Sequence, residues 1–457
     1  MTPPEVTLES SRPQSSEAWI GSLKIEMLNH ASVIIDIGGL SLLCDPWLTG
    51  TCFRNGWGLR YGHPEVLEKV GRATHLWISH FHSDHFHPAT LKVVAEKNPN
   101  ICVIKNESLH FSMRPTLQKL GFTRFLSLEE RTPLNLSDEV SVTRYPSTGI
   151  DNMLAIKSKR YTVLNYNDCN LPRRALSKIV SRIGPVDVFF CNFNHGHKIF
   201  DVESPEEIKR LFRENFWRTV QTVNPRWVIP FASHHYYRSR YSMNQNPSLL
   251  SIDELGREQT HLIPATPGSV VQFSGDNTLP QLERKESIQN PFEEKNYGPS
   301  IEWRILLEFA AQYRDRIRRQ FLGLTFWIPE LRIWVEDLKH MLIFSVSKGV
   351  FASKETFNKA DIVSHSTSLA DLFARPFGAD QFIVSADFGV VSKRTEAIRR
   401  FIFSIDLMDH HLDFRHLIQM IFSLDGIRFL WNRREELTAL ALASFNRRRS
   451  VKVGPRL

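Results

Sequence analysis

The chain has 457 residues and a net charge of +8, and 42% of its residues are hydrophobic and 23% charged. These proportions exclude a disordered or fibrous protein, and the length exceeds what one hydrophobic core usually serves, so two domains are expected. Residues 1–17 lack the apolar core of a signal peptide, no run of about 18 uncharged apolar residues occurs, and the five cysteines form no C-x-x-C pair. A cytoplasmic protein without a membrane span is expected.

Short β-like and helical segments alternate from residue 23 to residue 273, which is the pattern of a layered α/β domain. Helical spacing of apolar residues predicts helices at 87–96, 107–119 and 205–221. The expected strands are 23–28, 32–37, 40–44, 74–79, 140–145, 153–156, 161–166, 186–191 and 227–231. A Gly38-Gly39 turn should join the second strand to the third.

Four segments are expected along the chain: a tail at 1–22, a catalytic domain at 23–275, a polar linker at 276–299 and a smaller α+β accessory domain at 300–457. In the accessory domain, helices are expected at 301–321, 394–405 and 414–430, and β-like segments at 331–346, 362–364 and 381–391. Its histidines at 410, 411 and 416 lie in a helical, aromatic-rich context that is typical of core or surface histidines. No metal-ligand spacing is recognisable there.

The segment that follows the strand at 74–79 carries three histidines and one carboxylate within six positions: His80, His82, Asp84 and His85. Side chains two apart on an extended segment share a face, so His80 and His82 can converge on one ion while Asp84 and His85 turn toward a second. Imidazole with carboxylate suits zinc, iron or manganese, and the lack of cysteine argues against a closed structural zinc site. The motif predicts a centre with two metal ions.

Further ligands are expected at the ends of later strands. Asp168 follows the strand at 161–166 and is the best candidate for an oxygen ligand that bridges the ions, although it could instead cap the next helix. Asp151 is the only strong metal-binding side chain in the turn at 146–152. After the strand at 227–231, either His234 or His235 could complete the second ion's shell, and we favour His234. Asp84 and Asp168 are the expected catalytic residues.

Other polar residues near the same edge have open roles. Asp45 could accept a hydrogen bond from a metal-binding histidine or merely cap a turn. His30 precedes a strand, and no role is assigned to it. His195 and His197 are expected at the lip of the pocket or in a solvated loop. The aromatic residues Trp47, Phe53, Trp57 and Tyr61 are expected in the core rather than as a substrate platform.

These motifs resemble the metallo-β-lactamase superfamily, whose αββα sandwich holds two metals at one edge of its sheets. A closer resemblance, over residues 24–275, is to the metallo-β-lactamase-like part of the CMP-N-acetylneuraminate hydroxylases. It is carried by residues 45–48, 50, 55–57, 78–85, 88–92, 151, 165, 168, 169 and 230–232. The resemblance implies an O2-dependent hydroxylase, a monooxygenase with two metal ions, iron being favoured and zinc or manganese being possible. The implied substrate is a sugar-like or other polar anionic small molecule.

Three features depart from that family. No cysteine has a histidine at the C-x-H or C-x-x-H spacing of a Rieske cluster, and few residues precede the first strand, so electrons are expected from a separate ferredoxin or reductase. Ser147 stands where the superfamily places a third histidine on the first ion, with Asp151 as a possible substitute. His234 stands where the hydroxylases have another residue and the hydrolases usually have a ligand.

Two other functions stay open. A zinc-dependent hydrolase of an ester, lactone or phosphoester is favoured by His234 and disfavoured by Ser147. A non-catalytic, metal-stabilised scaffold should tolerate Asp84→Asn. The basic tail around residues 447–449 could attract an anionic substrate, but the aromatic-interleaved basic surface of a nuclease is not recognisable, so nucleic acid is not an expected partner.

Overall fold

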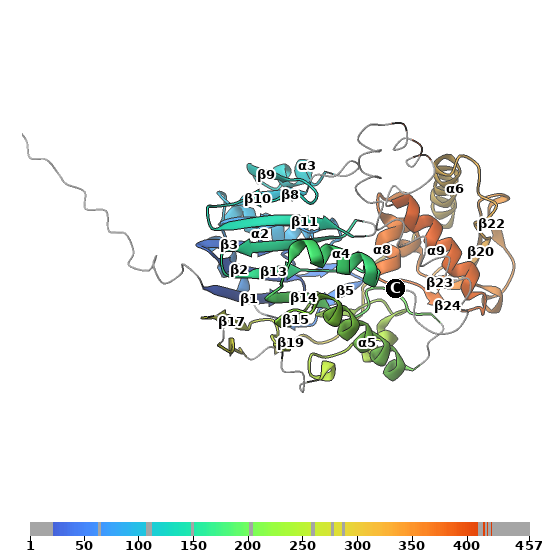
Figure 1. The fold of residues 1–457 in the computed structure, drawn as a ribbon. Helices are drawn as coiled ribbons and strands as arrows, with labels where there is room; N and C mark the ends of the chain where they lie inside the picture. The colour runs from blue at the N-terminus through green and yellow to red at the C-terminus, as the bar shows by residue number, and fades with distance from the viewer. Residues whose placement is uncertain are drawn as a thin grey trace, which may run out of the picture.

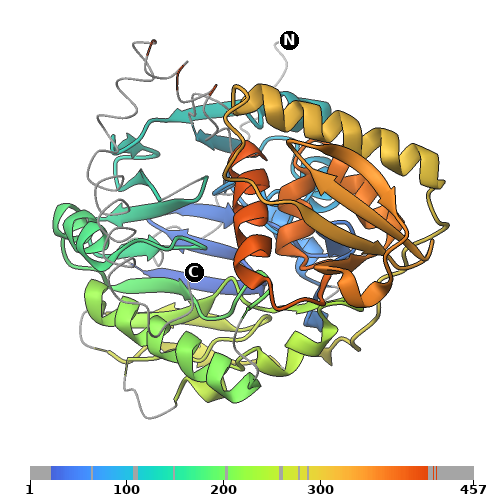
Figure 2. The same cartoon turned by 90° about the vertical axis from the view of Figure 1, so that its right-hand side faces the viewer.

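The computed structural model describes residues 22–409, apart from 63–64, 107–111, 148–149, 201–203, 257–260, 276–277 and 286–287, and also the single positions 415, 418 and 422. Two stacked sheets with helices on their outer faces form the first part of the chain, and a second group of helices and a sheet lies against one end of them (Figure 1). A view turned by 90° shows this second group in front of the strand ends (Figure 2).

The first sheet has eight strands in the order β18-β17-β1-β2-β3-β7-β8-β9. Their bounds are β1 Leu23–Asn29, β2 Ser32–Ile37, β3 Leu40–Cys44, β7 His75–Trp77, β8 Cys102–Asn106, β9 Arg124–Leu128, β17 Val270–Phe273 and β18 Gln281–Glu283. The predicted turn between β2 and β3 is confirmed, with Gly38 and Gly39 at φ angles of 52° and 76° that favour glycine. Helices α1 (Val66–Lys69), α2 (Pro88–Lys97) and α3 (Arg114–Lys119) share an apolar core with the outer face of this sheet.

The second sheet has six strands in the order β10-β11-β12-β13-β14-β15. Their bounds are β10 Leu134–Asn135, β11 Val140–Pro146, β12 Asn152–Ser158, β13 Thr162–Asn165, β14 Val188–Asn192 and β15 Trp227–Phe231. Helices α4 (Arg173–Ile183) and α5 (Pro205–Val223) cover its outer face, and the inner faces of the two sheets enclose a common core. The four layers make an αββα sandwich, which confirms the predicted α/β fold class.

Helix α5 shows how local sequence sets an element's limits. Ser204 accepts a hydrogen bond from the N–H of Glu207, and Pro205 occupies the first helical turn, where a missing N–H costs little. The helix ends at Asn224, which adopts the left-handed conformation with φ 50°. Apolar residues recur on the buried face between these ends, so α5 packs along the second sheet.

Short strands extend the sandwich toward its end. β4 (Thr51–Cys52), β5 (Trp57–Leu59) and β16 (His235–Tyr237) make a three-stranded sheet, and β6 (Tyr61–Gly62) pairs with β19 (Ile288–Gln289). Short 3₁₀ helices lie at Val70–Arg72, Met243–Ser248, Asp253–Leu255 and Phe357–Lys359. Of these segments, β5 and β16 lie beside the strand ends where the histidine-rich loop lies, since the rings of Trp57 and His235 are near that of His30.

The C-terminal part has its own core between one five-stranded sheet and four helices. The sheet has the order β22-β21-β20-β23-β24, with β20 Leu331–Val335, β21 His340–Ser345, β22 Gly349–Ser353, β23 Ile362–Ser364 and β24 Gly389–Val390. The helices are α6 Trp303–Gln320, α7 Ser366–Ala374, α8 Gly378–Val384 and α9 Thr395–Asp409. The expected domain boundaries stay predictions.

The prediction of a β-like segment at 381–391 is wrong. Helix α8 occupies Gly378–Val384, and only Gly389–Val390 is a strand. The run Phe382-Ile383-Val384 has β-like composition but is too short for its period to be decisive, and Phe382 joins the core of the C-terminal part. Apart from the single positions 415, 418 and 422, the predicted helix at 414–430 lies outside the described residues, and so do the histidines at 410, 411 and 416.

Candidate metal centre

The histidine-rich loop leaves β7 at Trp77 and enters α2 at Pro88. Hydrogen bonds between side chains and the loop's backbone fix the point where it leaves the sheet. The Asp45 carboxylate accepts from the Ser79 N–H at 2.7 Å. The side-chain amide of Asn106 donates to the carbonyls of Ile78 and Ser79 at 2.8 and 2.9 Å. The loop therefore starts from an anchored position, which limits where its histidines can point.

His80, His82 and Asp151 form the first group of potential ligands, with ligand atoms within 4.8 Å of one another. His80 Nε2 lies 2.8 Å from His82 Nδ1 and 3.5 Å from an Asp151 carboxylate oxygen. Two imidazole nitrogens and one carboxylate oxygen that converge in this way can hold a divalent ion. The structure thus brings together the pair expected for one ion and the proposed substitute for the third histidine.

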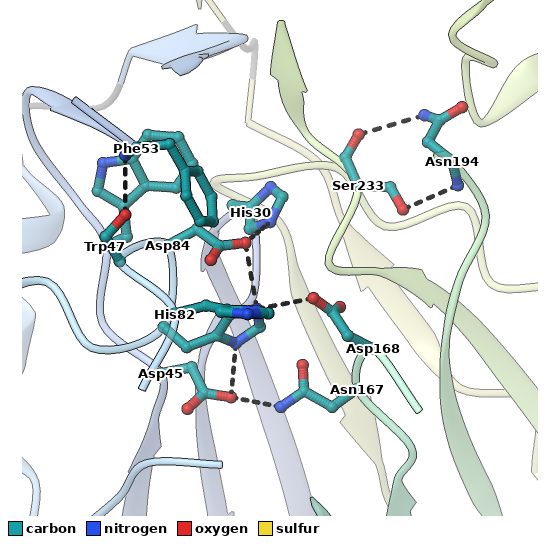
Figure 3. A network of polar contacts seen from close by, with 12 residues as sticks. His30, Asp45, Trp47, Phe53, His82, Asp84, Asn167, Asp168, Asn194 and Ser233 are labelled. Carbon is teal, nitrogen blue, oxygen red and sulfur yellow. Dashed lines mark hydrogen bonds and ion pairs between the residues drawn. The ribbon is translucent and has the colours of Figure 1, made fainter. Parts of the chain in front are cut away.

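His30, Asp84 and His85 form the second group. One Asp84 oxygen lies 3.2 Å from His30 Nε2 and 3.2 Å from His85 Nε2. His85 Nε2 also lies 3.0 Å from an Asp168 oxygen, and a third group of His80, His85 and Asp168 connects the other two. Figure 3 shows Asp84 and Asp168 approaching the site from two sides, and the bridging role of Asp168 stays a prediction.

Asp45 supports the second group from behind. Its fully buried carboxylate lies 3.2 Å from His85 Nδ1 and accepts a hydrogen bond of 2.6 Å from Asn167 (Figure 3). A carboxylate on one imidazole nitrogen directs the lone pair of the other nitrogen toward a metal. Two roles were open for Asp45, namely contact with a metal-binding histidine and the capping of a turn. The structure has the contact with the candidate ligand His85.

His234 does not join any of these groups. Its ring packs edge-on against Tyr61 and Phe193, with centroid distances of 5.5 and 5.7 Å. His235 stacks on Trp57 at 3.8 Å, with its centroid 5.5 Å from that of His30. The imidazole that joins His85 beside Asp84 is therefore that of His30. It comes from the first hairpin, a strand end to which the sequence assigns no ligand role.

The pair His195 and His197 was expected at the lip of a pocket or in a solvated loop. That expectation is wrong for His195, which is buried between the Tyr237 hydroxyl and the Ser248 hydroxyl, each 2.9 Å from a ring nitrogen. Burial and the neighbouring His197 lower the pKa of His195 to about 3, so it is a neutral core residue.

The electrostatics of the groups favour a bound cation. Burial alone lowers the pKa of His85, but the carboxylates of Asp84, Asp168 and Asp45 raise it well above its ordinary value. For His82, burial is likewise opposed by nearby carboxylates, and the pKa rises to about 9. The carboxylates thus stabilise positive charge at the imidazoles, which a metal ion can supply in place of protons.

The residues also pass a test of fit to a metal. The second oxygens of Asp84 and Asp168 are buried and accept no hydrogen bond from the protein, as is the case for Nδ1 of His30. An ionised carboxylate oxygen in such a position is costly unless something positive binds it. This donor set of imidazoles and carboxylates therefore supports metal binding.

The aromatic residues near the site are mainly core, as expected. Trp47, Phe53 and Trp57 are 0, 1 and 3% exposed and pack with Tyr237 in one apolar cluster. All five cysteines are buried, and none of them forms a disulfide. A membrane-crossing helix needs a long apolar run, and none of the helices in the described part of the chain has one.

Comparison with known families adds to this geometry. Residues 24–232 match the family model described as a beta-lactamase superfamily domain. This part of the chain is a metallo-β-lactamase-fold domain. The match ends just after β15, so it includes the whole second sheet, the first sheet except for β17 and β18, and every member of the three ligand groups.

Curated relatives of this domain include the cytidine monophosphate-N-acetylneuraminic acid hydroxylases. The Asterias rubens protein is 25% identical over 56% of this chain and 42% of its own length, and the Xenopus laevis protein is 28% identical over 50% and 40%. The Mus musculus protein is 25% identical over 73% of this chain and 61% of its own length. The chain thus spans about half the length of these relatives.

Solved structures with a similar arrangement include CmlA, a diiron beta-hydroxylase from Streptomyces venezuelae. It is 18% identical with a TM-score of 0.40, covering 55% of this chain and 54% of CmlA. An isothiocyanate hydrolase from Delia radicum gut bacteria is 15% identical with a TM-score of 0.41, covering 55% of this chain and all of that one. Similarity at this level does not choose between the two activities.

Proposed function

We propose that the chain is a metal-dependent enzyme with a two-metal centre that hydroxylates a polar anionic small molecule with O2. The substrate class rests on the relatives, whose names specify a nucleotide-linked acidic sugar. In the net reaction one atom of O2 enters a C–H bond of the substrate and the other leaves as water. Two protons and two electrons are consumed, the electrons being supplied by a ferredoxin or reductase.

The observation that carries this proposal is the proportion of carboxylate in the ligand set. Three carboxylates, from Asp84, Asp151 and Asp168, stand among the imidazoles of His30, His80, His82 and His85. Ser147, where the superfamily places a histidine, is buried and supplies no imidazole. Non-haem iron sites that react with O2 combine histidine with carboxylate and keep open positions, and a bound pair of irons would supply the redox chemistry.

Exposure suggests how the chain's residues divide the work. The Asp84 and His85 side chains are 2 and 0% exposed, so in this proposal they only hold and orient an ion. Asp168 is 27% exposed and Asp151 20%, so the substrate approaches from their side. Asp168, near both groups, is the carboxylate best placed to contact both an ion and the reacting molecule.

The test begins with the metal content of protein purified without added metal, followed by reconstitution with Fe²⁺ or Zn²⁺. Iron-loaded protein, reduced by ferredoxin and its reductase, should consume O2 and add one labelled oxygen atom from ¹⁸O2 to CMP-N-acetylneuraminate or a related acidic nucleotide sugar. Asp168→Asn should abolish the product, whereas Asp187→Asn, just before β14 and away from the groups, should not.

A zinc-dependent hydrolase is the second candidate, favoured by one observation. His30, Asp84 and His85 form a set of two imidazoles and one carboxylate, which is a common ligand set of hydrolytic zinc. A metal-bound water at such a site attacks an ester or phosphoester. Hydrolysis of such probes by the zinc-loaded protein, with no reaction of the reduced iron form with O2, would replace the hydroxylase proposal by this one.

A further inference from the structure

The C-terminal part of the chain reaches the candidate metal centre through one carboxylate. Asp380, on α8, lies with a carboxylate oxygen 2.9 Å from Nε2 of His82, a residue 298 positions earlier. Asp380 is 1% exposed, and the His82 side chain is 16% exposed. This is a buried contact between two distant segments, and no spacing in the sequence indicates it.

Helix α8 touches the same region at two further points. The Phe377 ring, just before α8, packs against Phe81 at a centroid distance of 4.7 Å. At the other end, Ser385 lies so close to Gly56 that a Cβ added there would lie 2.2 Å from the serine Cβ. The helix is therefore packed along the histidine-rich loop and its neighbour, and the Asp380 contact is not an isolated one.

The position of Asp380 is itself fixed from behind. The backbone N–H groups of Ala379 and Asp380 donate to one oxygen of Asp409 at 2.9 and 3.2 Å. The other oxygen of Asp409 lies 3.5 Å from the guanidinium of Arg316 on α6. The end of α9 thus holds the first turn of α8, and with it the carboxylate that faces His82.

The two ring nitrogens of His82 have different partners. Nδ1 lies 2.8 Å from His80 Nε2, on the side of the first ligand group, while Nε2 faces Asp380. An ionised carboxylate can only accept, so it favours the imidazole form with the proton on Nε2. That form leaves the Nδ1 lone pair for a metal ion shared with His80 and Asp151.

We propose that Asp380 is a positioning residue of the metal centre, which accepts the Nε2–H of His82 and so presents Nδ1 to the first ion. This inference rests on the two-metal centre proposed above but not on the reaction assigned to it. The C-terminal part then serves as a second source of support for the metal ligands, equivalent on the first ion to Asp45 on the second.

The test compares the full-length protein with Asp380→Asn, Asp380→Ala and the control Asp371→Asn. Asp371 is a partly exposed carboxylate of α7 that pairs with Arg375 on the surface. Removal of a carboxylate that orients a metal-binding histidine costs about 10- to 100-fold in metal affinity. Titration with Co²⁺ against a competing chelator, followed by visible absorption, measures the affinity for each ion. Both Asp380 variants should bind one of the two ions about 10- to 100-fold more weakly, and Asp371→Asn should bind both ions as tightly as the wild type.

A second measurement reads the histidine directly. The ¹⁵N shifts of His82 in zinc-loaded protein should report a protonated Nε2 and a metal-bound Nδ1 in the wild type, and a mixture of forms in Asp380→Asn. If the wild type binds two ions and both Asp380 variants bind them equally tightly, the positioning role is wrong while the metal centre stands. If the wild type binds no metal, the proposed centre fails and this role fails with it. Should Asp380→Ala not fold, Asp380→Asn decides, because it keeps the size of the side chain.

Discussion

At the scale of single residues, the sharpest question is which imidazole completes the second ligand group. His30 Nε2 lies 3.2 Å from Asp84, whereas His234 packs between Tyr61 and Phe193. We expect His30→Gln to lower the metal content from about two ions to about one, and His234→Gln to leave it unchanged. Elemental analysis after dialysis against a weak chelator measures this.

Thermal unfolding of both variants is the control for folding. Loss of an ion from His234→Gln but not from His30→Gln would return the ligand role to the residue that the sequence favoured.

A second residue-scale prediction concerns Glu26, whose carboxylate lies 2.8 Å from Arg72 and 3.0 Å from Lys69. Burial raises its pKa, but hydrogen bonds and charge from Lys24, Lys69 and Arg72 lower it from 4.5 to about 2. The folded-state pKa is depressed, so the stabilisation is complete above pH 4.5 and is lost as the pH falls toward 2.

We therefore expect Glu26→Gln to reduce the free energy of unfolding by about 1–3 kcal/mol at pH 7, and the difference from wild type to shrink between pH 5 and pH 3. Urea unfolding at each pH measures both effects. Glu68→Gln, at a 76% exposed side chain, is the matched control and should change little. A difference that stays constant across this pH range would contradict the assignment.

The site residues divide into those that the sequence could indicate and those that it could not. His80, His82, Asp84 and His85 stand in one short motif, and strand ends of one sandwich edge bring Asp151 and Asp168 to them, although their ligand roles stay predictions. The side chains that support the imidazoles, such as Asp380, come from far along the chain. Their positions depend on tertiary packing, which leaves no periodic signal.

At the scale of elements, strands with strong alternating or apolar patterns were predictable to within a few residues. Helix α4 was not expected, although Leu176, Ile179 and Ile183 recur at helical spacing on its buried face. The local composition of α8 is β-like and predicts a strand, which is wrong. The structure packs α8 against α7 and α9, and tertiary contacts of this kind can override local propensity.

The packing of α8 on α7 depends on one glycine. A Cβ at Gly378 would lie 2.3 Å from the carbonyl oxygen of Asp371 and 2.6 Å from that of Leu372. Gly378→Ala should therefore push the helices apart and reduce the free energy of unfolding by about 1–3 kcal/mol. Because α8 carries Asp380, the same variant should also weaken binding of the first ion.

Gly71→Ala is the matched control, since its nearest atom, the carbonyl oxygen of Lys97, is at an ordinary 3.7 Å. Chemical denaturation gives the stability of both variants, and Co²⁺ titration gives their metal affinity. A stable Gly378→Ala variant with unchanged metal binding would show that α8 can shift without affecting His82.

At the scale of the whole molecule, a buried ion pair connects the sandwich, the stretch expected as a linker and the C-terminal part. Lys295 donates to Asp387 at 2.5 Å, and both side chains are almost fully buried. Asp387 also accepts from Ser239 in the first part at 2.6 Å and from Ser368 on α7 at 2.5 Å. The two cores are thus joined by a satisfied polar network and not by apolar contact alone.

Removal of one partner should be far worse than removal of both. Lys295→Met leaves the Asp387 carboxylate buried without its cation, and we expect a loss of about 3–5 kcal/mol in the free energy of unfolding. Lys295→Met combined with Asp387→Asn should recover part of that loss, and Lys285→Met, at an exposed lysine, should have little effect. Burial raises the pKa of Asp387, but the Lys295 ammonium and the other hydrogen-bond donors together lower it by more, so the pKa lies below its ordinary value. The stabilisation from the pair is therefore lost as the pH falls below the ordinary range of an aspartate.

Unfolding followed by tryptophan fluorescence and by circular dichroism measures whether the two cores separate. If the network couples them, the two signals should coincide in the wild type and split into two transitions in Lys295→Met, because the Asp387 carboxylate, which also accepts from Ser239 of the sandwich, is then buried there without its cation. Since Asp380 reaches His82 from that same part, the variant should also bind the first ion more weakly. Coincident transitions and wild-type metal affinity in Lys295→Met would mean that the apolar and ring contacts of α8 suffice to hold the two parts together.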